Sequence, residues 1–151
     1  MLKNSDELNG MREAGKLAAE VLEMITDYVK PGISTGELDE ICFKYITDVQ
    51  KAIPANVGYR GFEKTLCTSI NQFICHGIPD TNRILKSGDI MNIDVTVIKD
   101  GWHGDTSKMF LIGKAQSHNE RLVRVTQECL YKGIEAARPG ARLGDIGNAI
   151  Q

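Results

Sequence analysis

The chain has 151 residues, a length that fits one domain with a sizeable core. Apolar residues make up 42% and charged residues 25%, the values of an ordinary globular protein, which excludes disordered and fibrous classes. Eighteen Lys and Arg against 20 Asp and Glu give a net charge of −2, which argues against binding to nucleic acid or anionic membranes through bulk charge.

The sequence shows no signal that would direct the chain to a membrane, to secretion or to an organelle. No apolar run reaches the roughly 18 residues that a bilayer span needs. The segment from Met1 to Glu7 has neither an apolar signal core nor the Arg-rich, acid-poor composition of a transit peptide. The four cysteines, at 42, 67, 75 and 129, are irregularly spaced and predict free thiols in a reducing compartment. We therefore expect a cytoplasmic protein without a membrane partner.

Two amphipathic helices are predicted at the start of the chain. Apolar residues recur at three- and four-residue steps from Asn4 to Val29, with Asn4 as the N-cap and Pro31-Gly32 as the stop. A second helix follows at once, because Ser34 and Glu37 have the spacing of a capping box ahead of another apolar stripe.

Strands and turns are predicted next, where short apolar runs are broken by Gly, Pro and Asn. We expect strands at Thr65 to Ile70 and at Phe73 to His76. The strongest prediction is a hairpin of Ile90 to Ile98 and Trp102 to Ile112. Its loop, Asp100-Gly101, is a residue pair favoured in two-residue type I′ turns.

A third helix is predicted after the hairpin, with Ser117 and Glu120 at capping-box spacing and Pro139-Gly140 at its end. A fourth helix should begin near Arg142. Helices that flank an antiparallel hairpin indicate an α+β fold.

Two stretches of the sequence match at an offset of 108 residues. Lys30-Pro31-Gly32 and Gly36-Glu37-Leu38 correspond to Arg138-Pro139-Gly140 and Gly144-Asp145-Ile146. The match is either chance, since Pro-Gly helix breaks are common, or an internal duplication of a helix–helix–sheet unit. A duplication predicts a first repeat at about 1–113 and a truncated second repeat at about 114–151. The chain would then be the front part of a longer protein.

Asp94 and Asp105 are the first candidate site residues. If Asp100-Gly101 forms the two-residue turn, Asp94 faces Ser107, and Asp105 becomes its diagonal neighbour on the same face of the hairpin. Two carboxylates on apolar strands are costly unless a cation compensates them. Such oxygen ligands suit a pair of divalent metals about 3.5–4 Å apart. The spacing fits equally well an exposed sheet face that carries two solvated acids.

His76 is the next candidate, because it is expected at a strand end beside a Gly and Pro turn, where it could face a cleft. A purely structural histidine is the alternative. Cys75 would point to the opposite face of that strand, which disfavours a Cys–His nucleophile pair. His103 shares a face with Asp105 and is a candidate ligand or ligand neighbour. The cysteines lack the C-x-x-C spacing of structural zinc sites.

Four motifs stand out together. They are Lys-Pro-Gly-Ile-Ser-Thr-Gly-Glu-Leu-Asp at 30–39, Cys-His-Gly-Ile-Pro at 75–79, Gly-Asp-Ile-Met-Asn-Ile-Asp-Val-Thr at 88–96 and Gly-Trp-His-Gly-Asp-Thr-Ser at 101–107. With these motifs, essentially the whole chain resembles the bacterial type I methionine aminopeptidases. That resemblance implies the pita-bread fold of creatinase and the aminopeptidases, here its first pseudo-symmetric half and the opening helices of the second. It also implies removal of the initiator methionine from nascent peptides with two divalent ions, reported as Co, Mn, Fe or Zn.

The resemblance assigns roles to matching positions. Asp94 would be a bidentate metal ligand, Asp105 a bridging ligand, and His76 a catalytic residue that contacts the substrate near the scissile amide. The positions that would line the pocket for the methionine side chain are Tyr59, Phe62 and Cys67. The backbone at Asn71 matches a position that helps to hold a monovalent cation.

The sequence also departs from the family pattern. The remaining ligands, a His and two Glu, one of them also the general base, belong with a pocket Trp to the second half, which this sequence lacks. Gln72 stands where Glu is usual, Asn56 replaces a pocket Cys, and Glu63 replaces a Pro. These three changes could alter substrate preference without affecting the family assignment.

Three functional hypotheses follow. The first is the N-terminal portion of a metal-dependent methionine aminopeptidase, with the 151-residue chain inactive by itself and prone to bind itself or its missing half; the ribosome is a further candidate partner. The second is a non-catalytic pita-bread module that binds a peptide or a protein. The third is a prolidase-like or creatinase-like enzyme, but those proteins carry an extra N-terminal domain, whereas the helices here begin close to Met1.

Overall fold

The computed structural model describes residues 4–151, so Met1 to Lys3, at the start of the segment tested for a targeting signal, lie outside the described residues. The chain divides into two compact units, one that ends at Lys114 and one that begins at Ala115. Within the described residues, no helix is long and apolar enough to cross a membrane.

The first unit opens with the two predicted helices. Helix α1 spans Ser5–Ile25, and the Asn4 side chain accepts a hydrogen bond of 2.9 Å from the Glu7 N–H, which confirms the predicted N-cap. The helix ends one turn before Val29. Helix α2 spans Thr35–Lys44, and Ser34 and Glu37 form the predicted capping box. A π-helical turn at Tyr45–Val49 extends it.

A four-stranded antiparallel sheet follows, with β1 at Ile53–Pro54, β2 at Leu66–Ile70, β3 at Ile90–Lys99 and β4 at Trp102–Leu111. β4 pairs with β3 along its whole length, from Ile90 opposite Leu111 to Lys99 opposite Trp102. Asp100 and Gly101 have φ values of 49° and 85°, and a type I′ turn requires positive φ at both central residues. The predicted hairpin is confirmed.

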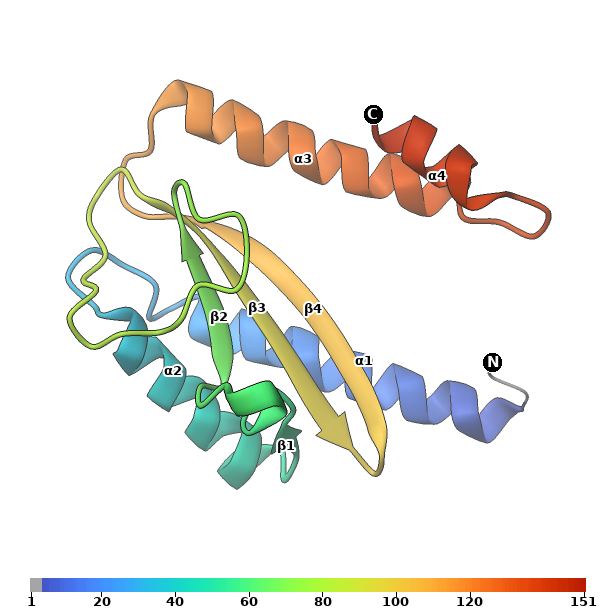
Figure 1. Cartoon of the computed structure of the whole chain (residues 1–151), viewed down its shortest axis with the longest axis horizontal. Coiled ribbons are helices and arrows are strands. Elements are labelled where there is room, and N and C mark those ends of the chain that lie inside the picture. Colours follow the sequence, from blue (N-terminus) through green and yellow to red (C-terminus); the bar gives the residue numbers. More distant parts are fainter. Residues whose placement is uncertain (1–3) are drawn as a thin grey trace. The chain divides into compact units, whose positions relative to one another are not determined.

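The core of this unit lies between one face of the sheet and the helices. The odd-numbered residues of β3 from Met91 to Val97 are buried, whereas the even-numbered residues from Asn92 to Ile98 are half-buried on the opposite face. Figure 1 shows α1 crossing behind β3 and β4, with α2 next to it. Hence α1 and α2 cover one face of the sheet, and polar side chains occupy the other face.

The strand predicted at Phe73 to His76 is wrong, because residues 71–80 form an irregular loop. Asn71 and His76 have φ values of 53° and 56°, which extended strands do not adopt. The argument that placed Cys75 and His76 on opposite faces of a strand therefore does not apply.

The second unit consists of α3 at Ser117–Ala136 and α4 at Leu143–Ile150. The capping box predicted for Ser117 is absent, because the helix already includes Ser117 and its N-cap is Gln116, which makes no side-chain cap bond. Most apolar side chains of α3 are exposed; Leu122, Leu130 and Ile134 are each 57% exposed.

The two helix–turn–helix segments repeat the same local structure at the offset of 108 residues. Helix α2 begins at Thr35 and helix α4 at Leu143, and each follows a glycine with a left-handed backbone, Gly32 at φ 98° and Gly140 at φ 89°. An acidic side chain at the third helical position accepts the N–H of the capping residue in both, at 2.9 and 2.8 Å. The duplication and the boundaries of its repeats stay predictions.

Candidate metal centre

Asp94 and Asp105 lie on the polar face of the β3–β4 hairpin. Asp94 is opposite Ser107 and Asp105 is opposite Thr96, so the two aspartates are diagonal neighbours with side chains on one face. The register follows from the two-residue turn, as the sequence predicts. Their common face is therefore confirmed, and the joint reach of both carboxylates to one small ion stays a prediction.

The two carboxylates are crowded. Burial raises the pKa of Asp94, and the nearby Asp105 charge and a hydrogen bond that protonated Asp94 donates to Asp105 raise it further, whereas the charge of His76 lowers it. Like charges in a half-buried place destabilise each other, and a divalent cation between them would relieve that repulsion. Paired carboxylates are also the hard oxygen donors that divalent metals accept, so these residues fit such an ion.

The described residues supply only part of a coordination shell. Within 4–151, no group of three or more His, Cys, Asp or Glu side chains is placed to hold a metal ion. Two carboxylates do not complete the coordination shell of a divalent ion, so these residues fit part of such a site.

A cavity of about 460 Å3 opens over these aspartates. Its lining residues are Asn56, Tyr59, Arg60, Phe62, Cys67, His76, Ile78, Asp94, Thr96 and Asp105. Of the seven residues to which the family resemblance assigns a role, all except Asn71 are among them. The structure thus combines an acidic end, a histidine and an apolar wall in one cavity.

Cys67 forms part of that wall from β2, directly opposite Asp94. The side chain is 8% exposed, and burial, followed by the charge of Asp94, raises the pKa of its thiol to about 11. The thiol is therefore neutral near pH 7, and it contributes a small apolar surface rather than a thiolate ligand.

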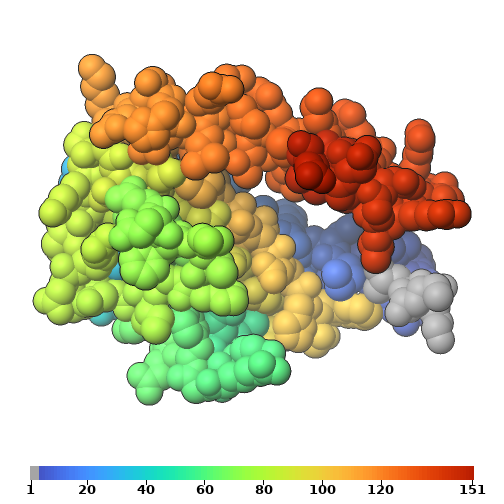
Figure 2. All heavy atoms as spheres, turned by 45° about the horizontal axis from the view of Figure 1, so that its top comes forward, coloured from blue at the N-terminus to red at the C-terminus, as the bar shows by residue number. Residues whose placement is uncertain are grey.

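Tyr59 and Phe62 reach the cavity from a short 3-10 turn before β2, at Tyr59–Gly61. The Asn56 side chain donates a hydrogen bond of 3.1 Å to the Thr65 carbonyl, which ties the residues before this turn to the start of β2. Arg60 has a left-handed backbone, with φ 49°, and its guanidinium lies 5.5 Å from the centre of the Tyr59 ring. Figure 2 shows the green side chains of this part of the chain on the face turned to the viewer.

The loop that carries His76 is fixed by Gly77. The Thr68 N–H donates to the Gly77 carbonyl at 2.7 Å, and the Gly77 N–H donates to Ser69 Oγ at 3.1 Å. A Cβ on residue 77 would lie 2.1 Å from the Thr68 carbonyl oxygen, so only glycine allows this approach. The sequence analysis missed this role of Gly77, although the residue stands inside the Cys-His-Gly-Ile-Pro motif.

Two predicted residues lie elsewhere. The Asn71 side chain accepts the Ile90 N–H at 3.0 Å and donates to Asp89 at 2.8 Å, and Asn71 does not line the cavity. His103 is opposite Ile98, nearer the hairpin turn, and is not a lining residue either. Thr96, Ile78 and Arg60 line the cavity without having been predicted.

Comparison with known proteins identifies the family to which this chain belongs. The model of metallopeptidase family M24 matches residues 9–151, and the chain belongs to this family. Membership implies the use of divalent metal. A methionine aminopeptidase of Salmonella typhimurium is 61% identical over 150 residues, which cover 99% of this chain and 57% of the relative. The chain thus spans little more than half the length of this relative.

Solved structures agree on the fold. A methionine aminopeptidase from Rickettsia prowazekii superposes with a TM-score of 0.94 at 54% identity, over 100% of this chain and 61% of that one. One from Thermotoga maritima gives a TM-score of 0.95 at 32% identity and covers 60% of that chain. A prolidase from Pyrococcus furiosus, at 16% identity and a TM-score of 0.80, shares the fold alone. The predicted α+β pita-bread fold is confirmed.

Proposed function

We propose that this chain is the first part of an enzyme that removes the N-terminal methionine from nascent peptides. The single observation that carries the proposal is the cavity in which Asp94, Asp105 and His76 meet the apolar residues Tyr59 and Phe62. The names of the relatives agree with it. A purely peptide-binding module would need no crowded carboxylate pair at the end of its groove.

The residues of the cavity divide into two groups by chemistry. Asp94 and Asp105 would hold the divalent ions, two in the complete site and drawn from Co, Mn, Fe and Zn. When bound, such ions supply Lewis-acid polarisation of the scissile carbonyl. The other ligands would come from residues beyond this sequence.

The substrate would be held by the remaining lining residues. Tyr59, Phe62 and the neutral Cys67 thiol would surround the methionine side chain, because an unbranched thioether packs well against aromatic and sulfur surfaces. His76, which also lines the cavity, would hydrogen-bond the peptide near the scissile amide and orient its carbonyl. Asn71 lies outside the cavity, and its backbone would help to hold a monovalent cation.

Partners and location follow from the same proposal. Nascent peptides are made in the cytoplasm, which is where we place the protein, and the ribosome is a candidate partner. The exposed apolar side chains of α3 support association of the chain with itself or with the rest of the enzyme.

The ligand roles can be tested without activity. Mn2+ titrated into the isotope-labelled chain should broaden the amide resonances around Asp94, Asp105, Cys67 and His76 before all others. Asp94→Asn and Asp105→Asn should each abolish this pattern. Asp100→Asn is the matched control, because it removes the same charge from the turn of the same hairpin, where Asn is equally favoured. Uniform broadening, or loss of the pattern in the control, would refute the assignment.

The reaction itself is tested with the peptide Met-Ala-Ser. We expect negligible hydrolysis by the metal-loaded 151-residue chain, since two carboxylates are no complete site. Activity should appear when the remaining part of a relative is added in trans, and Asp105→Asn should lower kcat/KM by at least about 100-fold. Robust turnover by the chain alone, or an equal rate in Asp105→Asn, would contradict the proposal.

A further inference from the structure

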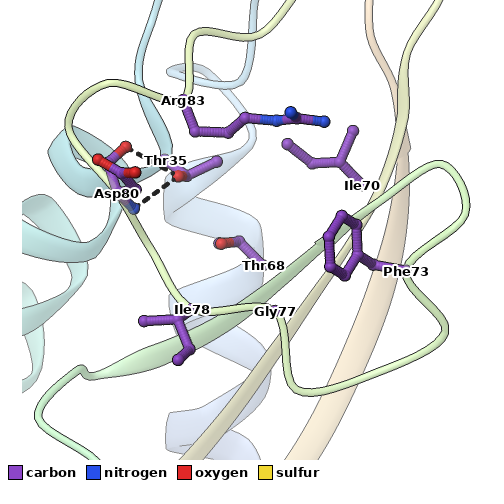
Figure 3. Close-up of a pocket in the computed structure, with 8 residues that line it drawn as sticks. All are labelled: Thr35, Thr68, Ile70, Phe73, Gly77, Ile78, Asp80 and Arg83. Carbon is purple, nitrogen blue, oxygen red and sulfur yellow. Dashed lines mark hydrogen bonds between the residues drawn. The ribbon is translucent and has the colours of Figure 1, made fainter.

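Two threonine hydroxyls of the sheet differ in whether a neighbouring group can reach them. Thr68 lines a smaller pocket of about 160 Å3, shown in Figure 3, where Thr35 exchanges hydrogen bonds with the Asp80 backbone. The Thr68 oxygen is fully buried and has no hydrogen-bond partner among the described residues, so no group in that pocket can contact it. Thr96 lines the larger cavity, and its oxygen is not fully buried. Of the two, Thr96 is therefore the one that can bond to a group in a cavity.

The Thr96 hydroxyl is free to donate a hydrogen bond. The residue is half-buried on β3, and its carbonyl accepts the Ala55 N–H at 2.9 Å. Its hydroxyl, in contrast, forms no hydrogen bond within residues 4–151. Since a hydroxyl offers one donor and two acceptor lone pairs, Thr96 can donate to an anionic neighbour without giving up another bond.

The register of the hairpin places Thr96 next to both aspartates. Thr96 lies directly opposite Asp105 and two residues after Asp94, and all three side chains project from one face of the sheet. Directly opposite residues have Cβ atoms about 4.5–5.5 Å apart, a distance that a hydrogen bond from a hydroxyl to a carboxylate can span. The Asp105 carboxylate is therefore within reach of the Thr96 hydroxyl.

The other polar neighbours of Asp105 on this face of the hairpin are placed less favourably. Ser107 lies two positions further along β4, and its hydroxyl already accepts the Asn92 side chain at 3.3 Å. His103 lies nearer the hairpin turn and does not line the cavity. The hairpin donor that faces both the cavity and Asp105 is therefore the Thr96 hydroxyl.

We propose that Thr96 is a positioning residue of the metal centre, whose hydroxyl donates to a carboxylate oxygen of Asp105 and fixes the orientation in which that carboxylate binds a divalent ion. This inference rests on the ligand roles proposed above for Asp94 and Asp105. A carboxylate that ligates a metal keeps lone pairs that the metal does not use, and loss of a neighbouring donor to such a ligand typically lowers metal affinity by about 10- to 100-fold. Thr96 acts through Asp105 and does not touch the ion.

The experiment measures the affinity of the 151-residue chain for Mn2+ from the electron paramagnetic resonance signal of the free ion. Thr96→Val keeps the side-chain shape but removes the donor, and it should raise the Kd for Mn2+ at least about tenfold. Thr96→Ser keeps the donor and should stay within about threefold of the parent. Thr106→Val is the matched control, because it makes the same change next to Asp105 but opposite Val95, on the covered face of the hairpin. It should bind Mn2+ like the parent.

The melting temperature without metal separates positioning from stability. Thr96→Val should melt no lower than the parent, since the lost hydroxyl has no partner among the described residues and valine is favoured in strands. An unchanged Kd in Thr96→Val, equal weakening in Thr96→Ser or in Thr106→Val, or a lower melting temperature of Thr96→Val would overturn the inference.

Asp94→Asn distinguishes the failure of this inference from the failure of the proposed function. If Asp94→Asn abolishes Mn2+ binding while Thr96→Val binds like the parent, the ligand roles stand and the role of Thr96 is wrong. If Asp94→Asn also binds Mn2+ like the parent, both are wrong. We expect loss of binding in Asp94→Asn and weakened binding in Thr96→Val.

Discussion

At the scale of single residues, Asp39 shows how a buried carboxylate positions the site. From α2, its side chain accepts the N–H groups of Thr65 at 2.8 Å and of Leu66 at 2.9 Å, where β2 begins. β2 then carries Cys67 to its place opposite Asp94. Asp39 lies outside both pockets, so it is a positioning residue rather than one that touches a substrate.

Replacement of Asp39 by Ala should destabilise the first unit. Two buried N–H groups would lose their acceptor, and we expect the free energy of unfolding to fall by about 2–3 kcal/mol. Urea denaturation measures this change. Asp27→Ala, at an exposed acidic residue, is the control and should stay within about 0.5 kcal/mol of the parent. Similar effects of the two substitutions would refute the anchoring role.

The pH dependence of stability should report the same residue. Burial raises the pKa of Asp39 above its ordinary value, and the hydrogen bonds from Leu66 and Thr65 lower it only in part. The folded state thus binds the Asp39 proton more tightly than the unfolded state does. The stability that this proton contributes is complete below the unfolded pKa of Asp39 and is lost as the pH rises through its folded pKa.

Asp39→Asn keeps the accepting oxygen but cannot titrate. The variant should therefore gain stability relative to the parent as the pH rises through the acid range, because only the parent carries the cost of the buried charge. Denaturation midpoints measured across that range test this expectation. A constant difference between the two proteins would show that Asp39 has no raised pKa.

At the scale of secondary-structure elements, the packing of α1 against β4 positions the strand that carries Asp105. Gly104, next to Asp105, lies so close to α1 that a Cβ there would be 2.0 Å from the Ala14 carbonyl oxygen. Helix α1 therefore reaches the covered face of the sheet where the opposite face carries the aspartates. The close approach makes the helix a rigid support for the hairpin.

Gly104→Ala should force α1 and β4 apart, and we expect a loss of about 1–3 kcal/mol in the free energy of unfolding. Gly15→Ala, on α1 with no atom within 4 Å of the added Cβ, is the control. It should raise stability by about 0.5–1 kcal/mol through better helix propensity. Thermal or urea unfolding distinguishes the two, and stabilisation by both substitutions would contradict the close packing.

At the scale of the whole chain, the two units differ in how well they bury their side chains. The first unit has an apolar core formed by α1, α2 and the sheet. In the second, the buried position within the described helices is Gly133, whereas Leu130, Ile134 and Leu143 are exposed. Little apolar burial therefore holds α3 and α4 together.

Hydrogen exchange should reveal this difference. Amides of α3 and α4 should exchange at least about 100-fold faster than those of β3 and α1, because local opening costs little where few apolar contacts are lost. Mass spectrometry after peptic digestion of the exchanged chain measures the exchange rate of each element. Equal protection in both units would mean that α3 and α4 are stabilised by contacts that their exposed side chains do not suggest.

The sequence by itself determined the features that depend on residues near one another in the chain. The N-cap at Asn4, the capping box at Ser34 and the Asp100-Gly101 turn follow from local backbone chemistry. Since the turn sets the register and side chains alternate along a strand, the common face of Asp94 and Asp105 follows as well. The motifs around them were enough to indicate the family.

Only the tertiary structure decided which distant segments meet. Residues 73–76 look like a strand in the sequence, but they lie in a loop whose Gly77 bonds to Thr68 and Ser69, and this pairing places His76 in the cavity wall. The anchoring by Asp39 and the unpaired Thr68 hydroxyl also depend on neighbours from other elements. Side-chain periodicity carries no information about such contacts, because their hydrogen bonds join residues that the chain brings together only when it folds.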